Sequence, residues 1–185
     1  MSRAICVFCS SSNRVDPAYF AAARDLGAAL ARRGDTLVWG GGKVGLMGEV
    51  ARACQAHGGG VIGVIPESMQ DVEIAYHDAD ELIVTQTMRE RKQIMDERAD
   101  AFVVLPGGFG TLEELAEILV LKVLKYTDRP LVILNIDGFY DPLHELFEHF
   151  IEHRCAGPEY REMYSFVDSI DAVFEALDQA WPSVR

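Results

Sequence analysis

The sequence contains no apolar run of the roughly 18 residues that would be needed to cross a membrane. Near its start, MSRAICVFCSSS holds only six apolar residues in a row, which is too few for the core of a signal peptide. We therefore expect no membrane as a partner, and we expect this stretch to form the first strand of the fold rather than a leader.

Positive charge is scarce as well. The chain has 17 Lys and Arg against 29 Asp and Glu, which gives a formal net charge of −12. Binding of nucleic acid without sequence preference needs a cationic surface, so this balance argues against nucleic acid as a partner. An anionic ligand must instead meet positive charge that is gathered locally.

Cysteine is also rare, with four residues in the chain. Cys6 and Cys9 spell C-x-x-C, a spacing that occurs in redox sites. Within a strand, residues three apart point to opposite faces, so these two thiols are poorly placed to form a disulfide. We expect buried, reduced thiols and a cytoplasmic protein.

Short apolar runs alternate with helical patterns along most of the chain. With 49% hydrophobic and 25% charged residues, the 185 residues suit one globular domain over residues 1–185. The runs predict strands at 4–9, 36–39, 61–65, 82–84, 101–105, 131–134 and 165–167. The patterns between them predict helices at 17–33, 46–57, 87–98, 111–126, 141–153 and 169–181.

These strands are continuously apolar rather than alternating, as is typical of a parallel sheet that helices cover on both faces. We therefore predict an α/β fold, a doubly wound, Rossmann-like parallel sheet of about seven strands. Two helix starts carry the same signal, because Asp16-Pro17 and Asp141-Pro142 each place an N-cap before a proline. Ligands are expected beyond the carboxyl ends of the strands.

The longest irregular connection is PESMQDVEIAYHDADE at 66–81, directly after a strand end. A long loop in this place is either a binding loop or lid, or an ordinary surface loop. The sequence leaves both interpretations open.

A first glycine turn, WGGGKVGLMGE at 39–49, satisfies G-x-G-x-x-G through Gly40, Gly42 and Gly45. It follows the second strand rather than the first, and the acidic residue near the expected offset, Glu67, lies in a different kind of loop. We interpret the glycines as allowing close approach of backbone to backbone or to a ligand. A dinucleotide-dependent enzyme stays as an alternative.

A second glycine turn, PGGFGTLEE at 106–114, leads from a strand into a helix. We expect Thr111 at the N-cap, with free N–H groups and the helix dipole forming a cradle for phosphate. T-L-E-E also fits a capping box in which Glu114 bonds back to the N-cap amide. The sequence therefore allows Glu114 to be either a helix cap or a chemically active group.

Basic residues gather in TMRERKQIMDER at 87–98, on the helix before the strand that ends at this second turn. Arg89 and Lys92 share a helix face, and Arg91 points elsewhere. A solvated face is the usual reason for such a cluster. The start of this helix should nevertheless lie at the ligand edge of the sheet.

One other cluster has ligand chemistry. His149 and His153 are four apart, with Glu145 one turn earlier, which is a possible metal-binding face. The apolar residues between them make an ordinary amphipathic helix, so we expect no metal.

Together these motifs resemble the LONELY GUY family, the cytokinin riboside 5′-monophosphate phosphoribohydrolases, once mislabelled as lysine decarboxylases. PGGFGTLEE fits the family's P-G-G-x-G-T-x-x-E, and MRERK resembles M-H-E-R-K with Arg89 in place of histidine. VFCSSS resembles F-C-G-S-S with Ser10 in place of glycine, and VEIAYHD resembles E-x-A-H with Tyr76 in place of histidine. WGGGKVGLMG also fits, and the match runs in order through residues 4–135.

The resemblance implies hydrolysis of the N-glycosidic bond of a nucleoside 5′-monophosphate, releasing free base and ribose 5-phosphate without cofactor or metal. It implies catalysis by Arg91 and Glu114 in a homodimer. The substrate contacts that it implies are Glu73, Arg91, Lys92, Gly107, Gly108, Phe109, Gly110, Thr111, Leu112 and Glu113.

Two questions stay open at this point. The base is either an isoprenylated adenine or plain adenine, as in AMP. A non-catalytic nucleotide-binding or cofactor-binding sensor of the same fold is the alternative function. The presence of both Arg91 and Glu114 in matching motifs favours the enzyme, because a binder needs the glycines but not this pair.

Overall fold

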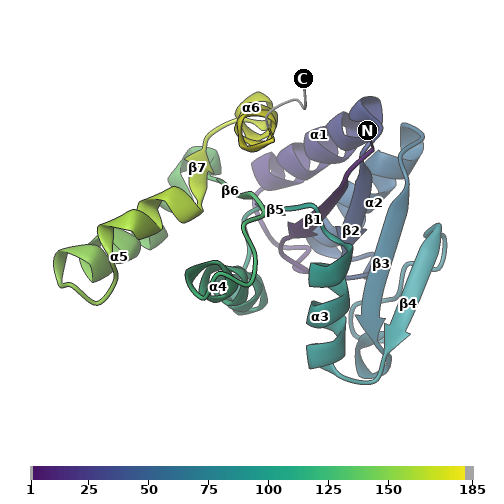
Figure 1. Ribbon diagram of the computed structural model, residues 1–185. Helices are drawn as coiled ribbons and strands as arrows, with labels where there is room; N and C mark the ends of the chain where they lie inside the picture. Colours follow the sequence, from purple (N-terminus) through teal and green to yellow (C-terminus); the bar gives the residue numbers. More distant parts are fainter. Residues whose placement is uncertain (1, 182–185) are drawn as a thin grey trace.

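Strands and helices alternate in the computed structural model, which describes residues 2–181 (Figure 1). The apolar runs predicted the strands to within two residues at each end. The strands are β1 (Ala4–Phe8), β2 (Thr36–Trp39), β3 (Val61–Pro66), β4 (Glu81–Thr85), β5 (Ala101–Val104), β6 (Leu131–Leu134) and β7 (Ser165–Val167).

The helices also follow the predicted order. They are α1 (Pro17–Arg33), α2 (Gly45–Ala56), α3 (Met88–Arg98), α4 (Phe109–Val123), α5 (Asp141–Glu152) and α6 (Ile170–Ala180). Three short 3-10 turns complete the list: η1 (Glu67–Met69), η2 (Ile136–Gly138) and η3 (Pro158–Met163).

The two predicted Asp-Pro helix starts differ in the structure. Asp16 caps α1 as predicted, because its carboxylate accepts a hydrogen bond from the Ala18 amide at 2.8 Å. The prediction for Asp141 was wrong, since Asp141 is already the first residue of α5 and Tyr140 is the N-cap. The Asp141 carboxylate instead accepts a hydrogen bond from the side-chain amide of Asn135 at 2.7 Å.

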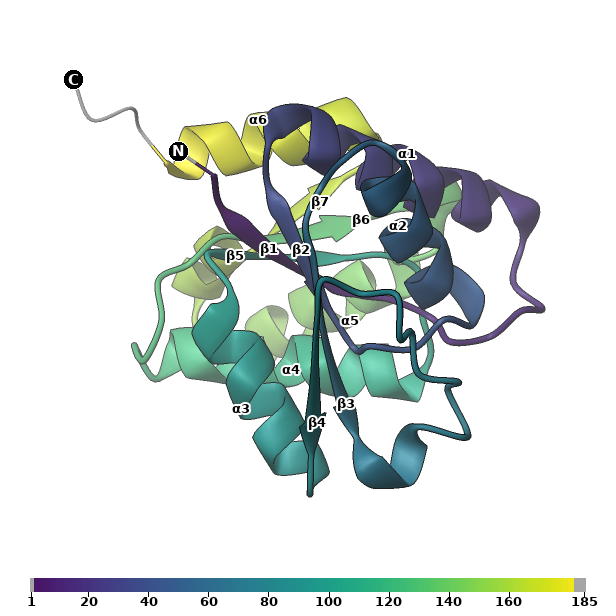
Figure 2. The same ribbon diagram turned by 90° about the vertical axis from the view of Figure 1, so that its right-hand side faces the viewer.

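The seven strands form one parallel sheet in the order β4-β3-β2-β1-β5-β6-β7. Figure 2 shows α1, α2 and α6 on one face of the sheet and α3, α4 and α5 on the other. Each face has its own buried apolar cluster, so the central strands are covered on both sides and carry apolar residues at successive positions. The predicted doubly wound fold is confirmed.

The strand order reverses between β1 and β5, which are direct neighbours. From β1 the chain proceeds outward to β2, β3 and β4, and from β5 it proceeds the other way. The loops that follow these two strands therefore diverge and leave a crevice at the carboxyl edge, where ligands bind in such sheets. A hydrogen bond from the Ser10 amide to the Pro106 carbonyl, 3.2 Å long, joins the two loops.

The C-x-x-C pair is divided between the two faces of the sheet. Cys6 belongs to the cluster under α3, α4 and α5, and Cys9 to the cluster under α1, α2 and α6. Both thiols are buried and free, as predicted. Within residues 2–181, no helix combines the length and the apolar character required of a membrane span.

We predict that the start of α3 depends on a reciprocal cap. The Glu90 amide donates to the Thr87 hydroxyl and the Thr87 amide to the Glu90 carboxylate, each at 3.1 Å. Thr87→Ala should lower the free energy of unfolding by about 1 kcal/mol. Gln93→Ala, which breaks only an exposed contact with Glu97, should cost at most about 0.5 kcal/mol. Urea unfolding of both variants tests this, and a smaller loss for Thr87→Ala than for Gln93→Ala would contradict it.

Candidate active site

A cavity of about 510 Å³ opens at the point where the strand order reverses. One wall is the loop after β1, residues 9–12, and a second wall is the start of α4. The third wall comes from η1 and the loop after it, which brings Met69 and Glu73, and α3 adds Met88 and Arg91. Elements from both halves of the sheet therefore build one site.

Arg91 is a buried cation with fixed hydrogen bonds. Only 4% of this residue is exposed. Its Nε donates to the carbonyl oxygen of Val64 and its Nη2 to that of Gly40, each at 3.1 Å. Its ion-pair partner is Glu73, whose Oε2 lies 3.5 Å from Nη2. The guanidinium is thus held by a backbone carbonyl of β3 and by that of the residue after β2.

The first glycine turn makes room for this arrangement. A Cβ on Gly40 would lie 1.9 Å from Arg91 Nη2, and one on Gly42 would lie 3.0 Å from the Glu73 Cβ. Gly45 has a φ of 58° and would bring a Cβ within 2.4 Å of the Ser11 backbone. The glycines therefore allow other parts of the chain to approach this backbone closely, rather than a ligand. This packing gives no support to a dinucleotide site.

The second glycine turn begins its helix earlier than predicted. α4 starts at Phe109 with Gly108 as N-cap, so the expected N-cap at Thr111 and the capping box with Glu114 are both wrong. Gly107 permits this turn, because a Cβ at residue 107 would lie only 2.0 Å from Oγ1 of the buried Thr111. Glu114 lies beyond the first helical turn, and the helix-cap explanation for this carboxylate no longer applies.

Glu114 is partly buried at the wall of the cavity. Desolvation raises the pKa of its carboxyl to about 7. Arg91 and Lys92 oppose this rise in pKa, whereas the charges of Glu73 and Glu113 add to it. Burial also raises the pKa of Glu73, against the opposing effect of Arg91. Two carboxyls with raised pKa values therefore share one cavity with one buried cation.

The structure brings most of the predicted site residues together. Those that line the cavity are Glu73, Arg91, Gly108, Phe109, Gly110, Thr111, Glu113 and Glu114. Gly107, Leu112 and Lys92 do not line it. Gly107 supports the turn from behind, and Leu112 is an exposed side chain of α4.

Lys92 lies in a second groove of about 410 Å³ between α3 and α4. Its ammonium group pairs with the carboxylates of Glu113 and Glu117 on α4, and these partners raise the pKa of Lys92 although burial opposes them. Arg89, which stands where the family has histidine, lines this groove and not the cavity. Glu114 borders both spaces.

Several lining residues were not predicted from the sequence. They are Cys9, the serine run Ser10–Ser12 and three methionines, Met47, Met69 and Met88. The serines could have been found, because they directly follow the central strand β1 at the ligand edge. The methionines come from three separate elements, and no sequence spacing indicates that they meet.

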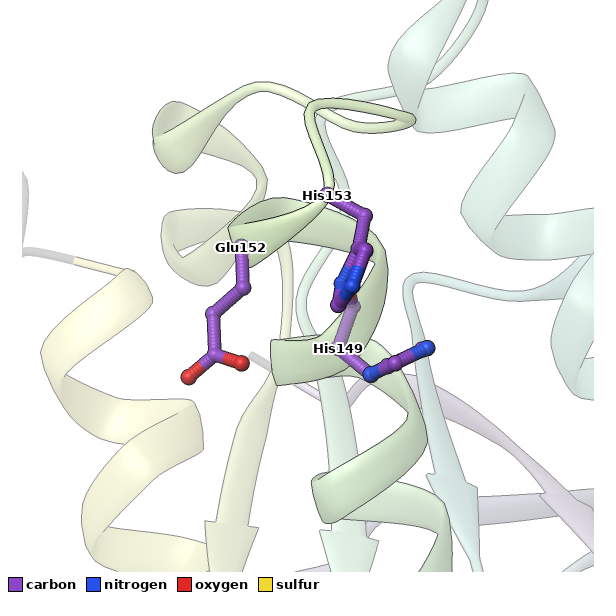
Figure 3. A group of neighbouring side chains, drawn as sticks. All are labelled: His149, Glu152 and His153. Atoms are coloured by element: carbon purple, nitrogen blue, oxygen red, sulfur yellow. The ribbon is translucent and has the colours of Figure 1, made fainter.

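The histidine pair on α5 lies outside this cavity. The acidic residue near His149 and His153 is Glu152, not Glu145 as the sequence suggested. One potential ligand atom from each of these three side chains lies within 4.8 Å of the others (Figure 3). All three side chains are exposed, and His153 Nδ1 already lies 3.0 Å from the His149 carbonyl oxygen. None of the three lines the cavity, and we assign them no part in its chemistry.

Known proteins share both the sequence and the fold. The family described as "Possible lysine decarboxylase" matches residues 47–177. A "Cytokinin riboside 5′-monophosphate phosphoribohydrolase" of Mycobacterium marinum is 42% identical over 172 residues, covering 93% of this chain and 91% of the relative. A protein of the same description from Mycobacterium tuberculosis is 47% identical over 154 residues, covering 83% and 82%.

Among solved structures, the molybdenum cofactor binding protein of Rippkaea orientalis aligns with a TM-score of 0.75, covering 97% of each chain. Because the sequence identity is only 22%, this alignment shows a common fold and nothing further. The family match and the two mycobacterial relatives each span most of the chain. The chain therefore belongs to the family described as possible lysine decarboxylases, and within it to the LONELY GUY group.

Proposed function

We propose that this protein hydrolyses the N-glycosidic bond of purine riboside 5′-monophosphates, releasing the free base and ribose 5-phosphate. The observation that carries the proposal is the meeting of Arg91 and Glu114 in one cavity whose wall is a glycine-rich helix start. The relatives described as cytokinin riboside 5′-monophosphate phosphoribohydrolases support the same reaction. We place it in the cytoplasm, as a single domain without metal or cofactor.

The start of α4 is suited to bind the 5′-phosphate. The first amides of a helix have no acceptor within the helix, and the helix dipole favours an anion there. At α4 these amides belong to residues 109–111, and Gly108 and Gly110 have open space where a Cβ would stand. A phosphate group can therefore approach the backbone closely. Arg91, already engaged with two carbonyls, is left to orient the substrate and balance charge.

The carboxylates of Glu113 and Glu114 are suited to interact with the ribose. As the C–N bond breaks, positive charge develops on the ribose ring, and an ionised carboxylate beside it stabilises that charge. Glu114 lies one turn along α4 from the phosphate site, within the cavity. We assign it the stabilisation of the cationic ring and the deprotonation of the attacking water. Glu113, also at the cavity, positions the ribose.

The first prediction concerns the product. Wild-type protein should release base from AMP or isopentenyladenosine 5′-monophosphate but not from the unphosphorylated nucleosides. Glu114→Gln should lower kcat at least about 100-fold, because it removes the base and the countercharge. Glu117→Gln, one turn further along α4 and outside the cavity, is the matched control and should change kcat less than about threefold.

Chromatography of the free base measures both activities and shows which base is preferred. Binding of nucleotide by calorimetry without release of base from any of these substrates would contradict the hydrolase. The protein would then be a nucleotide sensor.

The second prediction is a pH dependence of stability. Because the pKa of Glu114 rises from 4.5 to about 7 on folding, the folded protein binds this proton more tightly than the unfolded chain. The stability that this group contributes is complete below about pH 4.5 and is lost as the pH rises toward 7. Arg91 and Lys92 reduce the effect, and Glu73 and Glu113 increase it.

Glutamine cannot ionise, so Glu114→Gln should be more stable than wild type at pH 8, and the difference should become small near pH 5. Urea unfolding of the two proteins at both pH values measures this. A difference that does not change with pH would show that the carboxyl is not destabilised by burial.

We further propose a homodimer, supported by an apolar surface beside the site. A groove of about 260 Å³ between α4, α5 and η3 is lined by apolar and aromatic side chains, among them Leu119, Val120, Phe147, Phe150 and Tyr160. On α4 itself Val120 is 54% exposed and Leu124 56%, and Phe109 at its start is 91% exposed. A second copy on this surface would cover exposed apolar side chains of α4, the helix whose start lines the cavity.

The third prediction tests this interface. Val120→Glu places a charge in the groove and should convert a dimer into a monomer in sedimentation or light scattering. Val72→Glu alters a side chain that is 69% exposed but lies outside the groove, and it should leave the mass unchanged. A Val120→Glu protein with the wild-type mass would rule out this surface as the interface.

A further inference from the structure

Glu73 is a buried carboxyl whose surroundings the proposed roles do not yet explain. It is 9% exposed and lines the cavity from the loop after η1, on a different wall from Glu114. Its side chain has one hydrogen-bond partner among the described residues, Arg91, at 3.5 Å. Charge-assisted pairs are commonly about 2.7–2.9 Å long, so this contact is a long one, and burial raises the pKa of Glu73 against the effect of Arg91. Such a group is available to hold a proton.

The backbone at Glu73 is held in an unusual conformation. The next residue, Ile74, has a φ of 49°, the left-handed region that β-branched residues rarely adopt. The Lys43 amide fixes it by pointing at the carbonyl oxygens of both Glu73 and Ile74, at 3.2 and 3.0 Å. An isolated bridge between Gly42 and Ala75 holds the same segment. Backbone strain of this kind concentrates at functional sites, where it positions a side chain.

Three methionines of the cavity lie around Glu73 and its partner Arg91, contributed by α2, η1 and α3: Met47, Met69 and Met88. The Glu73 amide donates to the Met69 carbonyl, and Met88 Sδ lies 3.9 Å from Arg91 Nη1. A Cβ on Gly42 would meet both Met47 and Glu73. Methionine side chains adapt to flat and irregular apolar groups, such as a purine ring and a substituent on it. With the phosphate at the start of α4 and the ribose beside Glu114, the base is left to lie against the methionines and Glu73.

The reaction requires a proton donor next to the purine base. When the C1′–N9 bond breaks, its electron pair goes to the purine, which leaves readily only if a ring nitrogen gains a proton. Of the described residues that line the cavity, none is His or Lys. Arg91 stays protonated and donates to carbonyls, and Glu114 serves the ribose and the water.

We propose that Glu73 is the general acid that protonates the leaving base. This inference rests on the proposed hydrolase and assigns the step which that proposal leaves open. The Glu73 carboxyl gives its proton to a purine ring nitrogen as the C1′–N9 pair moves to the base. Water adds its oxygen to C1′ and gives a proton to Glu114. The base leaves neutral, ribose 5-phosphate forms, and the proton on Glu114 is exchanged through solvent to restore Glu73.

The test varies the leaving group. AMP needs a proton to release adenine, whereas 7-methylguanosine 5′-monophosphate already carries a positive ring and releases a neutral base. Glu73→Gln should lower kcat for AMP at least about 100-fold with KM changed less than about threefold. For the methylated nucleotide the same variant should keep kcat within about fivefold of wild type, which also shows that it folds. Glu114→Gln should lose activity on both substrates.

Glu67→Gln is the matched control, an exposed carboxyl of the same loop that does not line the cavity, and it should act on AMP as wild type does. Two results would overturn the role of Glu73. In the first, Glu73→Gln lowers kcat for AMP by less than about tenfold. In the second, it lowers kcat equally for AMP and for the methylated nucleotide. A wild-type protein that releases no base from AMP or isopentenyladenosine 5′-monophosphate would instead overturn the proposed hydrolase itself.

Discussion

The burial of one guanidinium group, that of Arg91, is the constraint on which the site depends. A charged group that is 4% exposed is costly unless its N–H groups have acceptors, and here the acceptors are the carbonyl oxygens of Gly40 and Val64. The cation therefore ties α3 to the ends of β2 and β3. The glycine turn after β2 follows from this, because no side chain larger than hydrogen fits at Gly40 beside the guanidinium. A motif that resembles a nucleotide fingerprint is thus a requirement of packing.

The same cation sets the charge of the cavity. Glu73 and Glu114 both face Arg91, so with both carboxyls ionised the site would carry one uncompensated negative charge in a partly desolvated space. Desolvation raises the pKa of each carboxyl, and their mutual repulsion adds to the rise at Glu114. Glu113, the third carboxyl that lines the cavity, is paired with Lys92. Glu73 and Glu114 therefore share one cation and together tend to hold one proton. Acid and base chemistry on the same substrate requires one carboxyl in each state.

The sequence predicted the fold more completely than the site. Continuous apolar runs indicated a parallel sheet, and the motifs of Arg91 and Glu114 predicted that the two residues share one site, where both do line the same cavity. The start of α4 was misplaced, because glycines mark a turn but do not show that Gly108 rather than Thr111 is the N-cap. Lys92 stays a predicted substrate contact. Its pairing with Glu113 and Glu117 on α4 was not predicted, because the sequence of α3 does not show which helix faces it. The strain at Ile74 arises from long-range contacts and leaves no local pattern.

The hydrogen bond between the Ser10 amide and the Pro106 carbonyl has a mechanical consequence. It links the loops after β1 and β5, which form adjoining walls of the cavity, and each loop is also anchored by its strand in the centre of the sheet. The sheet and this hydrogen bond therefore hold the two loops in position relative to each other. Larger substituents on a ligand must be accommodated along the third wall, where Met69 and Glu73 belong to a loop outside the regular sheet.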